Sequence, residues 1–223
     1  MLPGEGHMEY TDIPEPQVTG DLVKIKIAYS GICGTDIHAM RGTYPSTKPP
    51  VVLGHEFSGV VVAVGENVRN IHVGDRVTSE TTYETCGSCH YCHTGDLNLC
   101  GARRGVGTNV NGSMAEYVVN HEARIHVLPE NVNLLAAALT EPLACGVHAV
   151  IERGHVHKGD IVCVFGAGAI GQMVAQVAHA CGATVIMAGL SSDVERLQIA
   201  TQCGIQRTVD QQAEELSGVI SEM

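Results

Sequence analysis

The sequence has little basic charge and few aromatic side chains. No tryptophan occurs in the 223 residues, and aromatic residues make up only 4% of them, so aliphatic side chains must form most of the core. Lysine and arginine number 13 against 24 aspartates and glutamates, which gives a formal net charge of −11. This deficit argues against a protein that follows the nucleic-acid backbone, because such proteins need a basic face. The hydrophobic fraction of 44% argues against a disordered chain.

The sequence also lacks a recognisable secretory leader. Residues 1–7 read MLPGEGH, with neither a basic segment nor an apolar one. The nine cysteines are an odd number, and together these features predict a reducing, cytoplasmic location in which clustered cysteines are metal ligands before they are disulfides. Cys163, Cys181 and Cys203 lie in apolar periodic segments and are expected to be buried thiols.

One stretch imitates a membrane span, because no charged side chain occurs between Asp160 and Asp193. Glycines interrupt it, however, and Gln172, Gln176 and His179 recur on one helical face, opposite an apolar stripe. A helix surrounded by lipid has no need of such a polar face. We therefore predict a buried strand, a glycine turn and an amphipathic helix, and no membrane partner.

Short strands separated by turns are predicted over about the first 130 residues. Residues 22–28 alternate between polar and apolar with period two, as in a half-buried strand. Further strand candidates are residues 56–64, 76–79, 112–119 and 125–127. This spacing is typical of a barrel-like all-β module.

The pattern changes after Pro129. Helices are predicted at 134–139 and 143–151, followed by a strand–helix–strand unit at 161–165, 170–181 and 184–188. A further helix from about 193 to 203 leads into a strand near 208–209. The predicted domains are residues 1–150 and residues 151–223.

Four cysteines form the strongest local motif, with the spacing Cys86-x2-Cys89-x2-Cys92-x7-Cys100. Thiolates three residues apart can converge on one ion, and a fourth from beyond a turn completes a tetrahedron around zinc. An iron–sulfur cluster would favour a last spacing of three residues followed by proline. Because four thiolates leave no open coordination position, the motif predicts a structural zinc site.

A glycine-rich turn follows the apolar strand at 161–165. Residues 166–171 read GAGAIG and open an amphipathic helix, which is the context in which G-x-G-x-x-G binds a dinucleotide. The predicted cofactor-binding residues are Gly166, Gly168, Ala169, Ile170, Gly171 and Gly189. Gly189 stands where an acid usually binds the adenosine ribose, so the choice between NAD and NADP stays open. Arg196 is either a partner for a 2′-phosphate or a solvated helical arginine.

Two shorter motifs carry metal-ligand residue types, GICGTDIH at 31–38 and GHE at 54–56. Each means little alone. Together with VGDRV at 73–77, the four-cysteine motif, EPL at 141–143 and the glycine turn, in this order, they resemble the zinc-dependent medium-chain alcohol dehydrogenases, most of all the sorbitol and threonine dehydrogenase branch. The resemblance implies a GroES-like β-barrel catalytic domain followed by the N-terminal half of a Rossmann dinucleotide-binding domain, in a chain that is truncated relative to that family.

The same resemblance implies roles for individual residues. Cys33, His55 and Glu56 are expected to bind a catalytic zinc, with Glu141 at the place of a further ligand. Such a zinc polarises the substrate hydroxyl, and nicotinamide accepts the hydride. Thr35 would accept the alcohol proton and His38 would pass it to solvent. Asp36 would either orient His55 or cap a turn.

Two functions are compatible with these features. The first is a zinc-dependent oxidoreductase that transfers a hydride between a secondary alcohol or sorbitol-like polyol and NAD or NADP, with two zinc ions per chain, in a homodimer or homotetramer. The second is a truncated, catalytically silent fragment that binds zinc and nucleotide. The intact set of ligands and relay residues favours the enzyme. The end at Met223 favours the fragment, and little activity is expected of the 223 residues alone.

Overall fold

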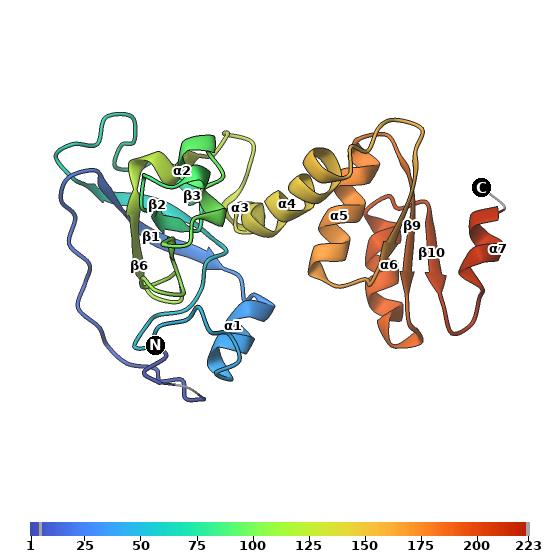
Figure 1. Ribbon diagram of the computed structural model, residues 1–223, viewed down its shortest axis with the longest axis horizontal. Coiled ribbons are helices and arrows are strands. Elements are labelled where there is room, and N and C mark those ends of the chain that lie inside the picture. Colours follow the sequence, from blue (N-terminus) through green and yellow to red (C-terminus); the bar gives the residue numbers. More distant parts are fainter. Residues whose placement is uncertain (5, 222–223) are drawn as a thin grey trace. The chain divides into compact units, whose positions relative to one another are not determined.

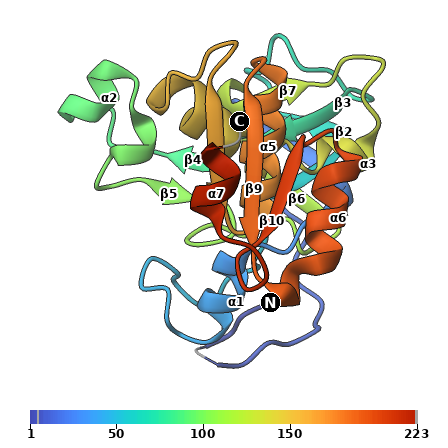
Figure 2. The same cartoon turned by 90° about the vertical axis from the view of Figure 1, so that its right-hand side faces the viewer.

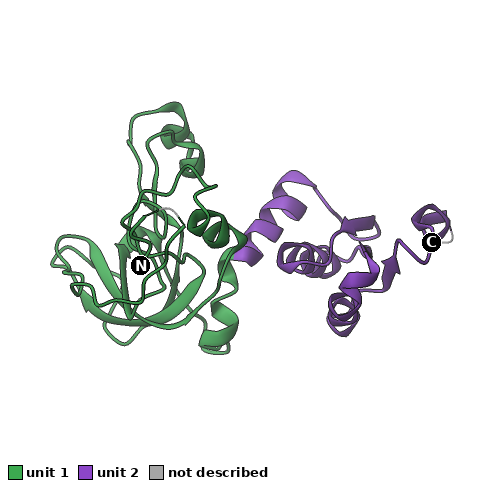
Figure 3. Cartoon of the chain, turned by 90° about the horizontal axis from the view of Figure 1, so that it is seen from below, with its two compact units in different colours: residues 1–141 green, residues 142–223 purple. Residues whose placement is uncertain are grey.

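The computed structural model describes residues 1–4 and 6–221. Contacts between residues divide the chain into two compact units, residues 1–141 and residues 142–223 (Figure 3). The sequence predicted a boundary after residue 150. The division comes earlier because Val147 and Val150 already pack into the core of the second unit.

A five-stranded antiparallel sheet forms the centre of the first unit (Figure 1). The strand order is β6-β1-β2-β3-β7, and the strands are β1 (Leu22–Ser30), β2 (Phe57–Val64), β3 (Arg76–Ser79), β6 (Tyr117–His121) and β7 (Ile125–Val127). Val23 and Ile25 on β1 are fully buried and pack with Phe57, Val61 and Val77, because alternate side chains of a strand share one face. The strands predicted at 22–28, 56–64, 76–79 and 125–127 are confirmed.

The strand predicted at residues 112–119 is wrong over its first half, since β6 begins only at Tyr117. The Gly112 N–H donates to the Val52 carbonyl at 2.8 Å, and the Met114 N–H donates to the Leu53 carbonyl at 2.9 Å. These bonds hold residues 112–114 against the segment before β2. Each residue has only one backbone N–H to donate. Gly112 and Met114 use theirs in these bonds, so they do not extend the β6 ladder.

Helices and a small lobe complete the first unit. Helix α1 (Gly34–Met40) follows β1, and α3 (Leu134–Ala137) lies near its end. Strands β4 (Thr82–Glu84) and β5 (Arg104–Gly105) form a two-stranded sheet. Between them lie α2 (His90–Thr94) and the 3-10 turn η1 (Leu97–Leu99). Of the four cysteines, Cys92 lies on α2, and Cys86, Cys89 and Cys100 lie in the turns that flank these elements. A second 3-10 turn, η2 (Glu122–Arg124), joins β6 to β7.

The second unit is built on a parallel sheet with strand order β10-β9-β8. Its elements alternate between strand and helix: β8 (Ile161–Phe165), α5 (Ala169–Ala180), β9 (Thr184–Gly189), η4 (Ser191–Asp193), α6 (Val194–Gln202), β10 (Arg207–Asp210) and α7 (Leu216–Ser221). The predicted strand–helix–strand unit and the helix after it are confirmed. The predicted helix at 143–151 is α4 (Thr140–Val147), which starts in the first unit and continues as the π-helix η3 (His148–Arg153).

Both faces of this parallel sheet carry apolar side chains. Val185 and Met187 on β9 point to the side of α5 and α6, where they pack with Ala175 and Leu197 among others. Ile186 belongs to a second cluster with residues of β10 and α7. Figure 2 shows α7 in front of the strands and α5 behind them. A strand buried on both faces reads as a continuous apolar run, which explains the uncharged stretch in the sequence.

Within the described residues, no helix combines the length and the apolar character needed to cross a bilayer.

Asn120 ties β6 to the end of β3 and the start of β4. Its side chain is fully buried, and Nδ2 lies within hydrogen-bond distance of Ser79 Oγ (2.9 Å) and the carbonyls of Glu80 (3.0 Å) and Thr82 (3.3 Å). The two N–H groups of one buried amide are therefore shared among three acceptors, of which the Glu80 carbonyl also accepts from Ser79 Oγ.

We expect Asn120→Ala to lower the free energy of unfolding by about 1–3 kcal/mol, because it leaves buried acceptors without a donor. Urea denaturation followed by circular dichroism measures this change. The matched control is Asn131→Ala at an exposed asparagine, which should cost less than about 0.5 kcal/mol. Equal effects of the two substitutions would contradict the role given to Asn120.

Candidate metal centres and nucleotide-binding turn

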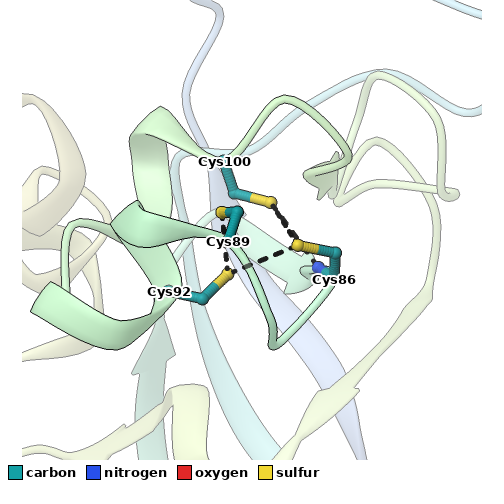
Figure 4. Close-up of side chains that lie close together, drawn as sticks. All are labelled: Cys86, Cys89, Cys92 and Cys100. Carbon is teal, nitrogen blue, oxygen red and sulfur yellow. Dashed lines mark hydrogen bonds between the residues drawn. The ribbon is translucent and has the colours of Figure 1, made fainter.

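The four cysteines of the lobe converge on one point (Figure 4). Their Sγ atoms all lie within 4.8 Å of one another, with distances of 3.9 Å for Cys86–Cys92, 3.5 Å for Cys89–Cys92 and 3.7 Å for Cys86–Cys100. A zinc ion with Zn–S bonds of about 2.3 Å sets tetrahedral sulfur atoms about 3.8 Å apart. The donor set therefore fits zinc.

The local backbone prepares these thiols for a cation. Cys89 lies at the N-terminus of α2, and Gly95 ends that helix in the left-handed region with φ of 89°, which turns the chain back toward Cys100. N–H groups of Ser88 and Cys89 hold the pKa of Cys86 down to about 6. His90 and His93 of α2 are exposed and lie outside the cysteine group.

A second group of ligand types lies where β1 ends and β2 begins. A ligand atom from each of Cys33, His55 and Glu56 lies within 4.8 Å of the other two. The pairing of Ser30 with Phe57 across β1 and β2 brings the two motifs side by side, since each motif continues directly from one of these residues. Thiolate, imidazole and carboxylate are a donor set suited to zinc, and three protein ligands leave a position for substrate.

Asp36 on α1 connects these two segments. Its carboxylate accepts the N–H of Cys33 at 2.9 Å and the N–H of Gly54 at 3.1 Å, and it lies 3.6 Å from Nδ1 of His55. Nδ1 of His55 is buried and forms no hydrogen bond with the residues that the structure describes. Asp36 therefore forms the cap that the sequence offered as one alternative, and it stands beside the histidine without a hydrogen bond to it.

Glu141 lies near this group without joining it. Its carboxylate is not among the mutually close ligand atoms of the described residues. Burial raises the pKa of Glu141, His55 and Arg103 oppose the rise with positive charge, and the Glu56 and Asp36 carboxylates add to it. Glu141 is thus a half-buried acid within electrostatic reach of the Cys33 group. Arg103 belongs to no motif, and only the structure reveals it here.

Thr35 and His38, the two residues of α1 that the family resemblance implies as a proton relay, occupy different surroundings. Thr35 Oγ1 lies 3.5 Å from Cys33 Sγ, at the edge of the ligand group. Burial raises the pKa of the Cys33 thiol, and its hydrogen bond with Thr35 opposes the rise. His38 is exposed and its Nδ1 lies 3.3 Å from Thr43 Oγ1. In the described part of the chain, no hydrogen bond joins Thr35 to His38.

The glycine-rich turn has the backbone expected of a nucleotide site. Gly166 takes a positive φ of 90° directly after β8, and Gly168 precedes the first turn of α5, which contains Ala169 and Ile170. A Cβ on Gly171 would overlap the carbonyl oxygen of Gly166. The turn is therefore as tight as the motif requires, and the N–H groups at the start of α5 can face a pyrophosphate.

The end of β9 carries no acid. Gly189 is buried, and a Cβ there would lie 3.2 Å from Leu197 Cδ2 and 3.3 Å from Asp193 Cβ. Asp193 accepts the N–H of Leu190 at 3.2 Å and pairs with Arg196 at 3.0 Å. Arg196 is thus held by a carboxylate on its own helix and stays largely exposed.

Residues 19–130 match the family of alcohol dehydrogenase GroES-like domains. The chain belongs to this family. Together with the relatives below, this match confirms the assignment to zinc-dependent medium-chain alcohol dehydrogenases of the sorbitol-like branch. It also confirms a GroES-like domain followed by part of a Rossmann-like fold.

Two curated relatives are each 48% identical to this chain. One is a D-arabitol-phosphate dehydrogenase of Enterococcus avium, matched over 100% of this chain and 63% of the relative. The other is a sorbitol dehydrogenase of Halalkalibacterium halodurans, matched over 99% of this chain and 64% of the relative. The chain thus spans less than two thirds of the length of these relatives.

Solved structures of the family superimpose well on the chain. A zinc-binding dehydrogenase of Sinorhizobium meliloti bound to NADP gives a TM-score of 0.90 at 35% identity, over 96% of this chain and 62% of that one. Galactitol-1-phosphate dehydrogenase of Escherichia coli gives 0.82 at 31% identity, over 95% and 60%.

Gly31 offers a direct test of the Cys33 group. It donates its N–H to the Glu56 carbonyl at 2.7 Å, and a Cβ on Gly31 would overlap Glu56 Oε2 and lie 3.1 Å from Glu56 Cβ. Gly31→Ala should therefore displace the carboxylate and reduce the zinc bound per chain by about one equivalent, while the cysteine lobe keeps its own. Elemental analysis after dialysis measures this loss.

Gly34→Ala is the matched control, because a Cβ at Gly34 meets no atom within 4 Å. This variant should bind as much zinc as the wild-type chain. If Gly31→Ala also retained full zinc content, Glu56 would not be a ligand.

Proposed function

We propose that this protein is a zinc-dependent oxidoreductase that transfers a hydride between a secondary alcohol or polyol and NAD or NADP. The observation that carries the proposal is the convergence of Cys33, His55 and Glu56 within 4.8 Å, in a chain that also has a dinucleotide-type glycine turn. The polyol part is supported by the relatives, whose names include sorbitol, D-arabitol phosphate and galactitol 1-phosphate.

Two zinc ions per chain are proposed, one for each ligand group. The four cysteines would hold a structural ion, because they leave no open position. Cys33, His55 and Glu56 would hold the second ion, with Glu141 close enough to act on its ligands. A zinc ion bound there supplies Lewis-acid polarisation of the substrate hydroxyl.

The chain's own residues would then handle the proton. Thr35 lies beside Cys33, so its hydroxyl is placed to accept the proton of a substrate hydroxyl. His38 is exposed on the same helix, and because an imidazole can both accept and donate a proton, it would pass that proton to water. With the proton passed to Thr35 and a hydride passed to a bound nicotinamide, the alcohol would leave as a ketone.

Asp36 would position His55 in this scheme. Metal-bound histidines commonly direct their second ring nitrogen at a carboxylate, and the 3.6 Å separation between Asp36 and Nδ1 of His55 supports this role. Gly166, Gly168, Ala169, Ile170, Gly171 and Gly189 are proposed to receive the dinucleotide.

The chemistry of the cysteines supports a proposal for the cellular location, and the family resemblance supports one for the oligomeric state. Nine cysteines, four of them gathered as thiols, suit a reducing compartment, and we assign the protein to the cytoplasm. A homodimer or homotetramer is expected from the family resemblance. The zinc-binding catalytic domain would correspond to the first unit, residues 1–141 in place of the predicted 1–150, and the second unit would form part of the nucleotide-binding domain.

Cys33→Ser tests the proposed function. In the complete gene product, turnover of a polyol with NAD or NADP should fall at least about 1,000-fold, because Lewis-acid stabilisation contributes several kcal/mol. The cysteine lobe should keep its zinc. Nicotinamide absorbance and elemental analysis measure the two effects on a panel of polyols, threonine and simple alcohols.

Cys203→Ser is the control, since Cys203 is exposed and outside both ligand groups. It should leave turnover unchanged. Wild-type turnover in Cys33→Ser would refute the assignment of Cys33 to the catalytic metal.

A further inference from the structure

Arg103 has an unusual environment for an arginine in an acidic chain. It precedes β5 and is partly buried. Its Nε donates to Thr82 Oγ1 at 2.8 Å, and Nη2 donates to Thr81 Oγ1 at 2.7 Å. Both partners are neutral hydroxyls. Throughout residues 1–4 and 6–221, no carboxylate lies within ion-pair distance of Arg103.

Neighbouring arginines differ in this respect. Arg104 pairs with Glu84 at 3.1 Å, and Arg124 pairs with Glu80 at 3.2 Å. A guanidinium offers five N–H donors, and Arg103 uses Nε and Nη2 in the described structure. Its Nη1 forms no hydrogen bond with any described residue. Among the described residues, the charge of Arg103 is therefore not paired with a carboxylate, and the N–H groups of its Nη1 have no acceptor.

Arg103 also lies near the candidate zinc ligands. The loop that follows Arg103 packs against the segment of His55 and Glu56, since a Cβ on Gly107 would lie 2.5 Å from the Gly54 carbonyl oxygen. Glu141 interacts electrostatically with Arg103, His55 and Glu56.

The segment of Tyr44 is joined to the same loop, because the Lys48 N–H donates to the Thr108 carbonyl at 2.8 Å. Tyr44 is exposed and interacts electrostatically with Arg103, and its hydroxyl forms no hydrogen bond with the described residues. The Arg103 guanidinium and the Tyr44 hydroxyl, here called the donor pair, are thus available beside the proposed reaction site.

We propose that the donor pair binds a phosphate monoester on the substrate, so that the substrate class is a phosphorylated polyol rather than a free one. This inference rests on the proposed function of the Cys33 group. A planar guanidinium binds phosphate oxygens in bidentate fashion. A phosphate has a third oxygen for the Tyr44 hydroxyl, whereas a carboxylate has only two oxygens in total.

A purely structural role for Arg103 makes different predictions. If Arg103 only braces Thr81 and Thr82, its replacement lowers thermal stability and leaves ligand preference unchanged. If it only balances the charge of Glu141, its replacement changes zinc affinity and leaves ligand preference unchanged. Preference between charged and uncharged ligands is therefore the readout that separates these roles from the proposed one.

The test compares the binding of D-sorbitol 6-phosphate, D-gluconate and D-sorbitol to the zinc-loaded chain by titration calorimetry at fixed ionic strength. The wild-type chain should bind the phosphate ester about 10- to 100-fold more tightly than sorbitol, as expected for hydrogen bonds to a charged group. Gluconate should bind more weakly than the phosphate ester. Equal binding of all three ligands, or tighter binding of gluconate, would overturn the proposal.

Arg103→Gln should abolish the preference for the phosphate ester. Arg104→Gln is the matched control, because it removes the same charge from the adjacent residue, which is already paired with Glu84. It should keep the preference. Arg103→Lys covers the case in which Arg103→Gln fails to fold, and it should reduce the preference while zinc content stays unchanged. A preference that survives in Arg103→Gln or in folded Arg103→Lys would contradict the role of Arg103.

Turnover of the complete gene product with the same three compounds separates this inference from the proposed function. Absence of hydride transfer from every compound, with zinc bound, would contradict the proposed function. Turnover of sorbitol and its phosphate with equal kcat/KM would contradict only the inference about Arg103.

Discussion

The carboxylate of Asp36 is the contact on which the geometry of the Cys33 group depends. It holds the N–H of Cys33 and the N–H of Gly54, which belong to segments on opposite sides of a strand pairing. Asp36 is only 4% exposed, so these charge-assisted bonds act in a medium of low dielectric constant. The same carboxylate faces His55. One side chain thus sets both the distance between the ligand segments and the surroundings of the imidazole.

The second constraint is the close packing of other atoms against glycine residues. Its consequence differs between the two units. In the first unit, Gly31 and Gly54 leave room for side chains, since a Cβ on either would strike Glu56 or Ser113 and Met114. In the second unit, Gly171 leaves room for the backbone of Gly166, which tightens the turn into α5. Glycine serves to position ligands in one case and to expose N–H groups in the other.

Much of this arrangement was predictable from the sequence because it depends on local periodicity and spacing. The alternation in β1 and the apolar run of β8, α5 and β9 identified their elements, and the spacing from Cys86 to Cys100 anticipated their convergence. Contacts between distant segments were not predictable. Residues 112–114 form hydrogen bonds with residues 52–54 instead of extending β6. Folding also brings Arg103 into contact with Thr81 and Thr82 and within electrostatic reach of Glu141.

The proposed pair of chemically different metal sites is tested most directly by X-ray absorption at the zinc edge. Four cysteines at one site and one at the other predict about 2.5 sulfur ligands per zinc on average, with nitrogen or oxygen as the remainder. Elemental analysis of the same sample should give two zinc ions per chain, one for each ligand group. A single zinc per chain surrounded by sulfur alone would contradict the account.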